Sequence, residues 1–362
     1  MVARPGRARF PLRCFHVSRR TDQRRHLHRS RCPRGRRLMN VLVTGANGFL
    51  GRHICEALRS QGHVPLAFVR RAASAQQLQK AGIDCRVGAF DDALSLQTSL
   101  KDISAIVHSA GGGKASRPAS FFENNVTPTE QLLQAASQSD MKRFILISSL
   151  AAAGPSPDGT PKLNTSPLTP ISPYGESKVQ AEELVQQAKT RFHMGIVRPP
   201  AIYGPEDTRL LPLFRAAYKR WAPIPGGLRK TLSLIHVKDC AAAIVRTLEA
   251  DYPNGTAFFV DDGAPHPVTE LIELMGLAYQ HRVITLGIPG WLFKPLALAG
   301  YGLSKTLGRE SIITPSKIKE LLCPHWVCES TQTQAILNWQ PQIPLDRGIA
   351  QTCEWYQQEG WL

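Results

Sequence analysis

The stretch that most constrains the fold runs from Val41 to Gly51. An apolar run that reads as a buried strand leads directly into "TGANGFLG", whose three glycines are spaced three residues apart. In such a turn the first glycine allows a tight bend, the second lets backbone approach a pyrophosphate, and the third lets the following helix pack close to the strand. The helix N-terminus then offers free N–H groups to phosphates. The predicted dinucleotide site of this turn comprises Gly45, Asn47, Gly48, Phe49, Leu50 and Gly51.

Further short apolar runs follow at regular intervals and alternate with helical patterns. The predicted strands begin at Asn40, Val64, Ala105, Arg143 and Met194. Strands that alternate with helices indicate a mainly parallel, doubly wound sheet. Continuous apolar runs suit a sheet that helices cover on both faces. We therefore predict an α/β chain with a doubly wound parallel-sheet Rossmann fold.

The pattern loosens after Tyr203, where proline-rich turns separate short helices. We interpret residues 39–203 as the dinucleotide-binding Rossmann domain and residues 204–362 as a smaller C-terminal lobe that binds the substrate. Within this lobe, residues 232–249 read as a strand and a helix that return to the Rossmann core.

The positive charge of the chain is concentrated in residues 1–38. The formal net charge is +16, and this basic leader holds thirteen arginines and one acid, Asp22. The remaining residues are nearly balanced, so the folded body gives no sign of a nucleic-acid partner. The leader has no apolar run of signal-peptide length. It is either a disordered extension, such as a mitochondrial targeting segment or an arm that binds polyanions, or the product of a start assigned too early, with Met39 as the true start. We expect a cytoplasmic protein, with mitochondrial targeting as the alternative.

Metal binding and membrane insertion find little support in the sequence. The eight cysteines are scattered, and the pair Cys323 and Cys328 lacks the second ligand pair that a zinc site would need. We predict reduced thiols and no metal. The most apolar segment, Leu286–Leu303, is interrupted by two prolines and Lys294. We interpret it as a segment that covers the substrate or as a buried helix, and we predict no transmembrane span.

The end of the second predicted strand bears on cofactor choice. Rossmann proteins that prefer NAD usually place an acid there to hold the ribose 2′-hydroxyl, whereas a nearby arginine accommodates the 2′-phosphate of NADP. Here the strand ends in Arg70 and Arg71, and no acid is present. The sequence therefore favours NADP over NAD, with Arg70 as the phosphate ligand because it comes first off the strand.

The stretch "SPYGESK" predicts the proton-transfer chemistry. Ser172 and Pro173 are a good helix start, and Tyr174 and Lys178 then lie four residues apart on one helical face. An ammonium beside a phenol favours the phenolate, so it lowers the pKa of the phenol toward the range that is useful for acid–base catalysis. Ser149 ends a strand of the same sheet, at the carboxyl edge where open α/β sheets bind ligands. Its hydroxyl would donate to a substrate carbonyl.

With these motifs in view, residues 39–362 resemble an extended short-chain dehydrogenase/reductase. The similar stretches include "TGANGFLG", "IVHSAG", "ENNVTPTEQLL", "ISSLAAAGP", "PYGESK", "RPPAIYGP" and "IHVKDCAAAI". The resemblance implies that Tyr174 is the general acid/base, that Lys178 is its partner and a ribose ligand, and that Ser149 orients the reacting oxygen.

The resemblance also implies further cofactor contacts. Ala110 would lie along the cofactor and Pro199 near the nicotinamide. Members of this family usually have a "GDL" motif whose aspartate lies near the adenine. In this chain the corresponding residues are "GAF", starting at Gly88, although an acid is kept shortly afterwards at Asp92. Extended members often form homodimers through a four-helix bundle, and a homodimer is possible here.

The residues after Ser149 narrow the substrate class. Sugar-nucleotide dehydratases have an acidic "TDEVYG" at this point, whereas this chain has "SLAAAG" without an acid. The motifs are more similar to the 3β-hydroxysteroid dehydrogenase and dihydroflavonol reductase branches. They imply hydride transfer between a nicotinamide and a secondary alcohol or ketone of a hydrophobic substrate that is sterol-, flavonoid- or lipid-like. Two alternatives remain, a nucleotide-sugar epimerase with retained NAD and a non-catalytic NAD(P)-binding subunit.

Overall fold

The predicted apolar strands lie side by side in one seven-stranded sheet of the computed structural model, which describes residues 38–112, 117–306 and 314–362. The leader predicted at residues 1–38 therefore falls almost wholly outside the described residues. All strand pairs of this sheet are parallel, and the order is β10-β6-β5-β4-β1-β2-β3. The strands are β1 (Asn40–Thr44), β2 (Val64–Val69), β3 (Asp84–Val87), β4 (Ala105–His108), β5 (Arg143–Ile147), β6 (His193–Arg198) and β10 (Thr256–Phe259).

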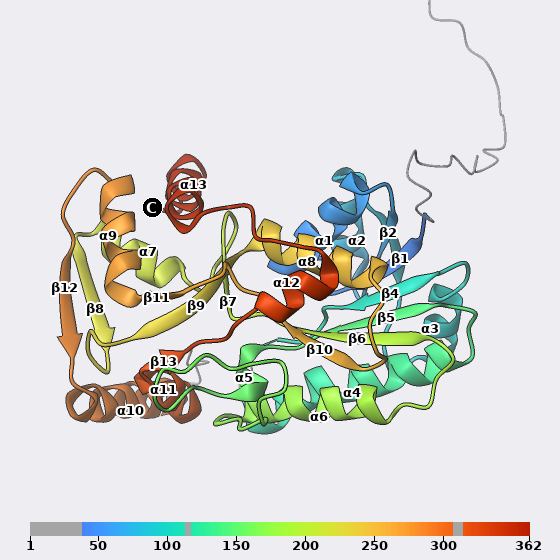
Figure 1. Cartoon of the computed structure of the whole chain (residues 1–362), viewed down its shortest axis with the longest axis horizontal. Helices are drawn as coiled ribbons and strands as arrows, with labels where there is room; N and C mark the ends of the chain where they lie inside the picture. The colour runs from blue at the N-terminus through green and yellow to red at the C-terminus, as the bar shows by residue number, and fades with distance from the viewer. Residues whose placement is uncertain (1–37, 113–116, 307–313) are drawn as a thin grey trace, which may run out of the picture. The chain divides into compact units, whose positions relative to one another are not determined.

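Helices cover both faces of this sheet, as the continuous apolar strands predicted (Figure 1). One face packs against α1 (Phe49–Ser60), α2 (Ala72–Lys80) and α8 (Val237–Glu249). The other packs against α3 (Ala93–Ser99), α4 (Pro118–Ser137) and α6 (Pro173–Gln187). The doubly wound Rossmann architecture is thereby confirmed.

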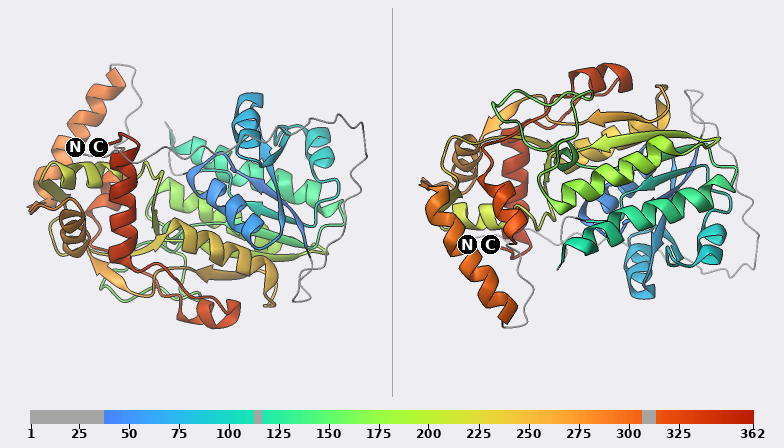
Figure 2. Two further views of the ribbon diagram at one scale, coloured as in Figure 1. Left: turned by 90° about the horizontal axis from the view of Figure 1, so that it is seen from above. Right: turned by 90° about the horizontal axis from the view of Figure 1, so that it is seen from below.

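The remaining elements form a second sheet, a separate ribbon and the helices that accompany them. A second sheet joins β7 (Ala201–Tyr203), β9 (Thr231–His236), β11 (Pro265–Pro267) and β13 (His325–Trp326), and a separate two-stranded ribbon joins β8 (Trp221–Pro225) and β12 (Ile284–Ile288). The accompanying helices are α5 (Leu150–Ala153), α7 (Leu211–Tyr218), α9 (Val268–Ala278), α10 (Gly290–Thr306), α11 (Pro315–Leu322), α12 (Thr331–Leu337) and α13 (Leu345–Gln358). Figure 2 shows two further views of this arrangement.

Residues 232–249 divide between the two parts of the molecule. Helix α8 packs against α1 and contributes to the apolar core on one face of the large sheet. Strand β9, in contrast, pairs with β7, β11 and β13 in the second sheet. The strand that does join the large sheet is β10, which pairs with β6.

The apolar segment Leu286–Leu303 forms the end of β12 and most of α10. The interpretation of this segment as a buried helix is wrong, because Trp291 is 76% exposed and Leu292 50% exposed, whereas Ala297 is buried. Within the described ranges, no helix is both long and apolar enough to cross a membrane.

Candidate active site

The structure shows why the turn after β1 needs glycine at two of its positions. Gly45 has a φ of +70°, and a Cβ added to it would lie 2.6 Å from the carbonyl oxygen of Ser109 at the end of β4. A Cβ on Gly51 would lie 2.1 Å from the carbonyl oxygen of Gly45, so only glycine lets α1 approach the turn this closely. Gly48 is the N-cap residue of α1, so no side chain caps the N-terminus of this helix. This arrangement fits a pyrophosphate held by backbone N–H groups.

The other residues predicted for this turn differ in what their side chains do. The Leu50 side chain packs against the core, and the Phe49 ring contacts the His53 ring, with centroids 5.7 Å apart. Asn47 is exposed. Phe49 and Leu50 are therefore placed to offer backbone N–H groups rather than side-chain atoms to a ligand.

Arg70 lies beside this turn. Thr44 of β1 pairs with Phe68 of β2, so Arg70 leaves β2 at the level of the glycine turn. Arg70 is exposed, and Arg71 is the N-cap residue directly before α2. The structure thus brings the predicted phosphate ligand to the edge that carries the glycine turn.

Asp92 has a local structural role. Its carboxylate accepts a hydrogen bond from the Ser95 N–H at 3.1 Å and caps the N-terminus of α3. A contact of Asp92 with an adenine stays a prediction.

A chain of directed hydrogen bonds fixes the segment after β4. Thr129 Oγ1 donates to the Asn125 carbonyl at 2.6 Å, so it accepts from His108 Nε2 at 3.1 Å. His108 Nδ1 then accepts from Thr44 Oγ1 at 2.7 Å, and this oxygen accepts the Ala110 N–H at 3.0 Å. His108 is therefore neutral, and its burial together with the charge of Lys178 lowers its pKa to about 3. The network holds Ala110 against the glycine turn.

Tyr174 and Lys178 lie on α6 as predicted. The helix begins at Pro173, and the Ser172 hydroxyl accepts the Gly175 N–H as the cap. Lys178 Nζ is buried, donates to the Ile147 carbonyl at 2.9 Å, and lies 6.0 Å from the centroid of the Tyr174 ring. Burial lowers the pKa of the Lys178 ammonium, whereas the proximity of Tyr174 opposes this shift.

Ser149 lies next to the first turn of α6. It caps α5 by accepting the Ala151 N–H at 3.1 Å. A Cβ on Gly175 would lie 2.4 Å from the Ala151 carbonyl, which shows how closely α6 approaches α5. Ser148 is buried, and its hydroxyl donates to Glu182, which lies two turns after Tyr174 on α6. The Ser148 hydroxyl is therefore engaged within the protein, whereas Ser149 lies beside the first turn of α6.

Pro199 completes this edge of the sheet. Its carbonyl accepts the Leu150 N–H at 2.9 Å, so the end of β6 lies beside Ser149. The preceding Arg198 forms a buried ion pair with Glu182, with Nη2 2.6 Å from Oε2. The structure thus brings Ser149, Tyr174, Lys178 and Pro199 to the carboxyl ends of β5 and β6.

Contacts that join other elements to this site were not predicted from the sequence. Asn125 of α4 accepts the Gly112 N–H at 3.2 Å and donates to the Ser177 hydroxyl at 3.0 Å, so it ties the segment after β4 to α6. The Glu320 carboxylate of α11 accepts from the Ser172 hydroxyl. Neither contact has a sequence signature, since the partners lie 52 and 148 residues apart.

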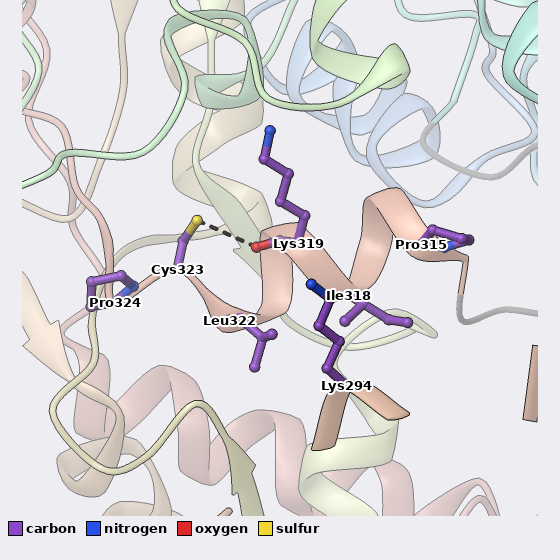
Figure 3. A pocket seen from close by; sticks show the side chains of 7 residues that line it. All are labelled: Lys294, Pro315, Ile318, Lys319, Leu322, Cys323 and Pro324. Carbon is purple, nitrogen blue, oxygen red and sulfur yellow. Dashed lines mark hydrogen bonds between the residues drawn. The ribbon is translucent and has the colours of Figure 1, made fainter. Parts of the chain in front are cut away.

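A hollow of about 500 Å³ opens between α10 and α11 (Figure 3). Its walls are mostly apolar, and two ammonium groups border it, those of Lys294 and Lys319. Glu320 of the same helix α11 accepts a hydrogen bond from the cap residue of α6, so the helix that lines this hollow also contacts the start of α6.

Comparisons with known proteins agree with this geometry. A ceramide reductase of Caulobacter vibrioides is 30% identical over 89% of this chain and 96% of its own length. A 4-hydroxy-2-methyl-3-oxo-4-farnesyl-3,4-dihydroquinoline-1-oxide ketoreductase of Stigmatella aurantiaca is 32% identical over 66% of this chain and 72% of its own. The fold is similar to that of a UDP-glucuronic acid 4-epimerase from Bacillus cereus, solved with UDP-glucuronic acid and NAD, with a TM-score of 0.69 and 19% identity over 89% of this chain and 100% of that one.

The sequence profile of one enzyme family matches residues 41–260, which span the glycine turn, Ser149, Tyr174 and Lys178. Its members and the relatives above include NAD-dependent dehydrogenases, reductases and epimerases. The chain is therefore an enzyme of this type and belongs to the NAD-dependent epimerase/dehydratase family.

Proposed function

We propose that this chain is an NAD(P)-dependent oxidoreductase acting on a secondary alcohol or ketone of a hydrophobic substrate. The observation that carries the proposal is the buried Lys178 ammonium, which the Ile147 carbonyl fixes beside the Tyr174 ring at the end of β5. A bound nicotinamide would supply or accept the hydride. Residues 39–203 would hold the cofactor, and residues 204–362 would supply most of the surface for the substrate.

Each side chain has a distinct task in this proposal. The Tyr174 hydroxyl gives a proton to the substrate oxygen during reduction and takes it back during oxidation. The Lys178 charge stabilises the negative charge that develops on the phenol oxygen. The Ser149 oxygen already accepts the Ala151 N–H, so its own hydrogen is available to donate to the same substrate oxygen.

The hydrophobic substrate class is supported by the residues around Ser149. Helix α5, which Ser149 caps, consists of a leucine and three alanines and offers no acid for water elimination. The two relatives described above are named for the reduction of a ceramide and of a farnesylated quinoline oxide. We extend that preference for lipid-like ketones to this chain.

A screen of cofactor oxidation tests the reaction. The purified full chain is mixed with NADPH or NADH and with a long-chain ketone, a ketosteroid or UDP-glucose, and the loss of reduced nicotinamide is followed. We expect oxidation with a hydrophobic ketone. Conversion of the UDP-sugar by protein that retains bound NAD would instead identify an epimerase. Tight nicotinamide binding without turnover of any compound would identify a non-catalytic subunit.

We also propose NADP as the preferred nicotinamide, because Arg70 emerges beside the glycine turn and no acid accompanies it. Arg70→Asp removes a cation from the expected 2′-phosphate and places an anion there. The ratio of NADP to NAD affinity is expected to fall by about tenfold or more, which corresponds to about 1.4 kcal/mol. Arg71→Asp makes the same charge change one residue away and is the matched control. An equal shift in both variants would remove Arg70 from the site.

A further inference from the structure

The ribbon of β8 and β12 has an unusual outward face. The two strands are parallel, and Ile284 pairs with Trp221, Leu286 with Pro223, and Ile288 with Pro225. Paired residues of neighbouring strands point to the same side of a sheet. The outward side of this ribbon is therefore made of six apolar residues, which we call the ribbon face: Trp221, Pro223, Pro225, Ile284, Leu286 and Ile288.

The described residues leave much of the ribbon face exposed. Trp221 is 57% exposed, Ile284 55% and Leu286 51%. The alternate residues of β8, Ala222 and Ile224, are buried in a small core with α9, so the ribbon is apolar on both sides. An antiparallel or isolated ribbon with one solvated side normally carries polar residues there.

The first turn of α10 extends the ribbon face. It follows β12 after Pro289, and its Trp291 and Leu292 are 76% and 50% exposed. Figure 1 shows β8, β12 and α10 together at one end of this part of the molecule, away from the large sheet. Exposed apolar residues gathered at one end in this way are typical of a surface that meets a partner.

The chain segments that form the ribbon face and the first turn of α10 carry charges of one sign. Residues 208–238 contain seven lysines and arginines, residues 274–309 contain four, and neither segment contains an acid. Lys219 and Arg220 directly precede Trp221, and Arg282 lies two residues before Ile284; all three are exposed. Among the described residues, none of these three forms an ion pair.

We propose that the ribbon face and the first turn of α10 dock on the surface of a bilayer that contains anionic phospholipid. Tryptophans and aliphatic side chains would enter the boundary between headgroups and acyl chains, while Lys219, Arg220 and Arg282 contact the lipid phosphates. A symmetric contact between two copies of this chain is disfavoured, because it would bring the same cations against each other. The contact is peripheral and does not require a membrane-spanning helix.

Tryptophan fluorescence with brominated lipids tests the docking. All six tryptophans follow residue 220, so none lies in the basic leader, which could itself bind anionic vesicles. The full chain is mixed with vesicles of phosphatidylglycerol and phosphatidylcholine whose acyl chains carry bromine. We expect vesicles to quench the emission of the parent, and we expect most of this quenching to disappear in the variant Trp221→Phe with Trp291→Phe.

A second pair of variants measures the apolar contribution. Leu286→Gln with Trp291→Gln changes two exposed residues of the docking surface, and co-sedimentation with anionic vesicles is expected to weaken by about tenfold. Val87→Gln with Leu94→Gln changes residues that are 53% and 73% exposed at the other end of this part of the molecule. This control is expected to bind vesicles within about twofold of the parent.

Three outcomes would overturn the proposal. One is a parent that sediments with vesicles without any quenching of its tryptophans. Another is equal quenching in the parent and in the variant without Trp221 and Trp291. The third is an oligomer of the parent in solution that the Leu286→Gln, Trp291→Gln variant no longer forms, because a second copy would then cover the ribbon face. None of these results bears on the reduction of ketones, which is assayed without vesicles.

Discussion

Strand β5 and the β8–β12 ribbon both carry apolar side chains on two faces, but only β5 is covered on both. In β5, Ile145 packs into the core on one side of the large sheet and Phe144 into the core on the other. In the ribbon, Ile224 is buried whereas Trp221 is exposed. The difference shows that an apolar pattern predicts a strand, while the helices elsewhere in the chain determine whether both of its faces are buried. The covered region can therefore hold a fixed site, and the uncovered one meets a partner.

The largest expected effect tests whether the proton donor of the reaction lies at the end of the covered large sheet. Tyr174→Phe removes one hydroxyl at the end of the large sheet, and kcat is expected to fall by about a hundredfold to ten-thousandfold with little change in stability. Tyr252→Phe is the matched control. Its hydroxyl donates to the Thr247 carbonyl at 2.9 Å, so its loss is expected to cost about 1 kcal/mol of stability and no activity. Activity of Tyr174→Phe within a few-fold of the parent would exclude Tyr174 as the proton donor.

The second prediction concerns the loss of stability when the buried ion pair of Arg198 and Glu182 beside the candidate site is broken. The side chains of Arg198 and Glu182 are only 4% and 0% exposed, and Ser148 also bonds to Glu182. Arg198→Met leaves a buried carboxylate unpaired, and the free energy of unfolding in urea is expected to fall by about 3–5 kcal/mol. Adding Glu182→Leu is expected to restore most of this loss. If the double variant is less stable than Arg198→Met, the carboxylate is not the cause.

The pH dependence of stability is expected to have opposite signs for two histidines, His108 and His266. Burial lowers the pKa of His108 to about 3, from about 6.5 in the unfolded chain. Between these values only the unfolded chain binds the proton, so stability falls by up to about 1.4 kcal/mol per unit as pH drops from about 6.5 towards 3. For His266, the hydrogen bond that its ring donates to the Asp262 carboxylate raises the pKa of the imidazole. Its contribution is present below about 6.5 and is lost as pH rises through the raised value.

Unfolding in urea between pH 5 and 8 checks both signs with two variants. His108→Asn is expected to flatten the loss of stability below about pH 6.5, although His236, whose pKa burial lowers to about 4, keeps part of it. His266→Gln is expected to reduce stability more at pH 5 than at pH 8. A His108 variant with the slope of the parent, or a His266 variant equally destabilised at both pH values, would contradict the respective assignment.

The sequence predicted the covered region well, because there local pattern and global fold agree. All five strands inferred from apolar runs lie in the large sheet, and the start of α6 at Pro173 follows from its cap. The pattern missed β3, whose residues Asp84–Val87 include an acid and an arginine, and β10, which enters the sheet from the C-terminal part of the chain. The strands of the ribbon were also missed, since prolines occupy two of the five positions of β8.

Site residues that lie close together in the sequence could be predicted. Contacts between residues far apart in the sequence could not. The spacing of Tyr174 and Lys178 and the glycine turn were visible in the sequence. The bond from Ser172 to Glu320 was not, because helix α11 reaches the site only through tertiary packing, 148 residues further along the chain. The exposure of Trp291 was equally invisible, since the apolar pattern of α10 also suits a buried helix.

The smallest expected effect is that of Ile284→Ala, and its comparison with Ile145→Ala distinguishes the two regions most directly. Ile145 of β5 is 0% exposed and Ile284 of β12 is 55% exposed. Ile145→Ala opens a cavity in the core and is expected to lower the free energy of unfolding by about 2–5 kcal/mol. Ile284→Ala, measured by urea unfolding without lipid, is expected to change it by no more than about 0.5 kcal/mol.

A large loss for Ile284→Ala would mean that Ile284 is covered in the free protein. The ribbon face would then be part of a core formed within the chain or between two copies, and the contrast with β5 would disappear. A small loss in stability together with weaker vesicle binding would mean instead that the apolar side chain contributes to docking and not to folding. The same substitution therefore distinguishes a strand face that folding buries from one that only a partner covers.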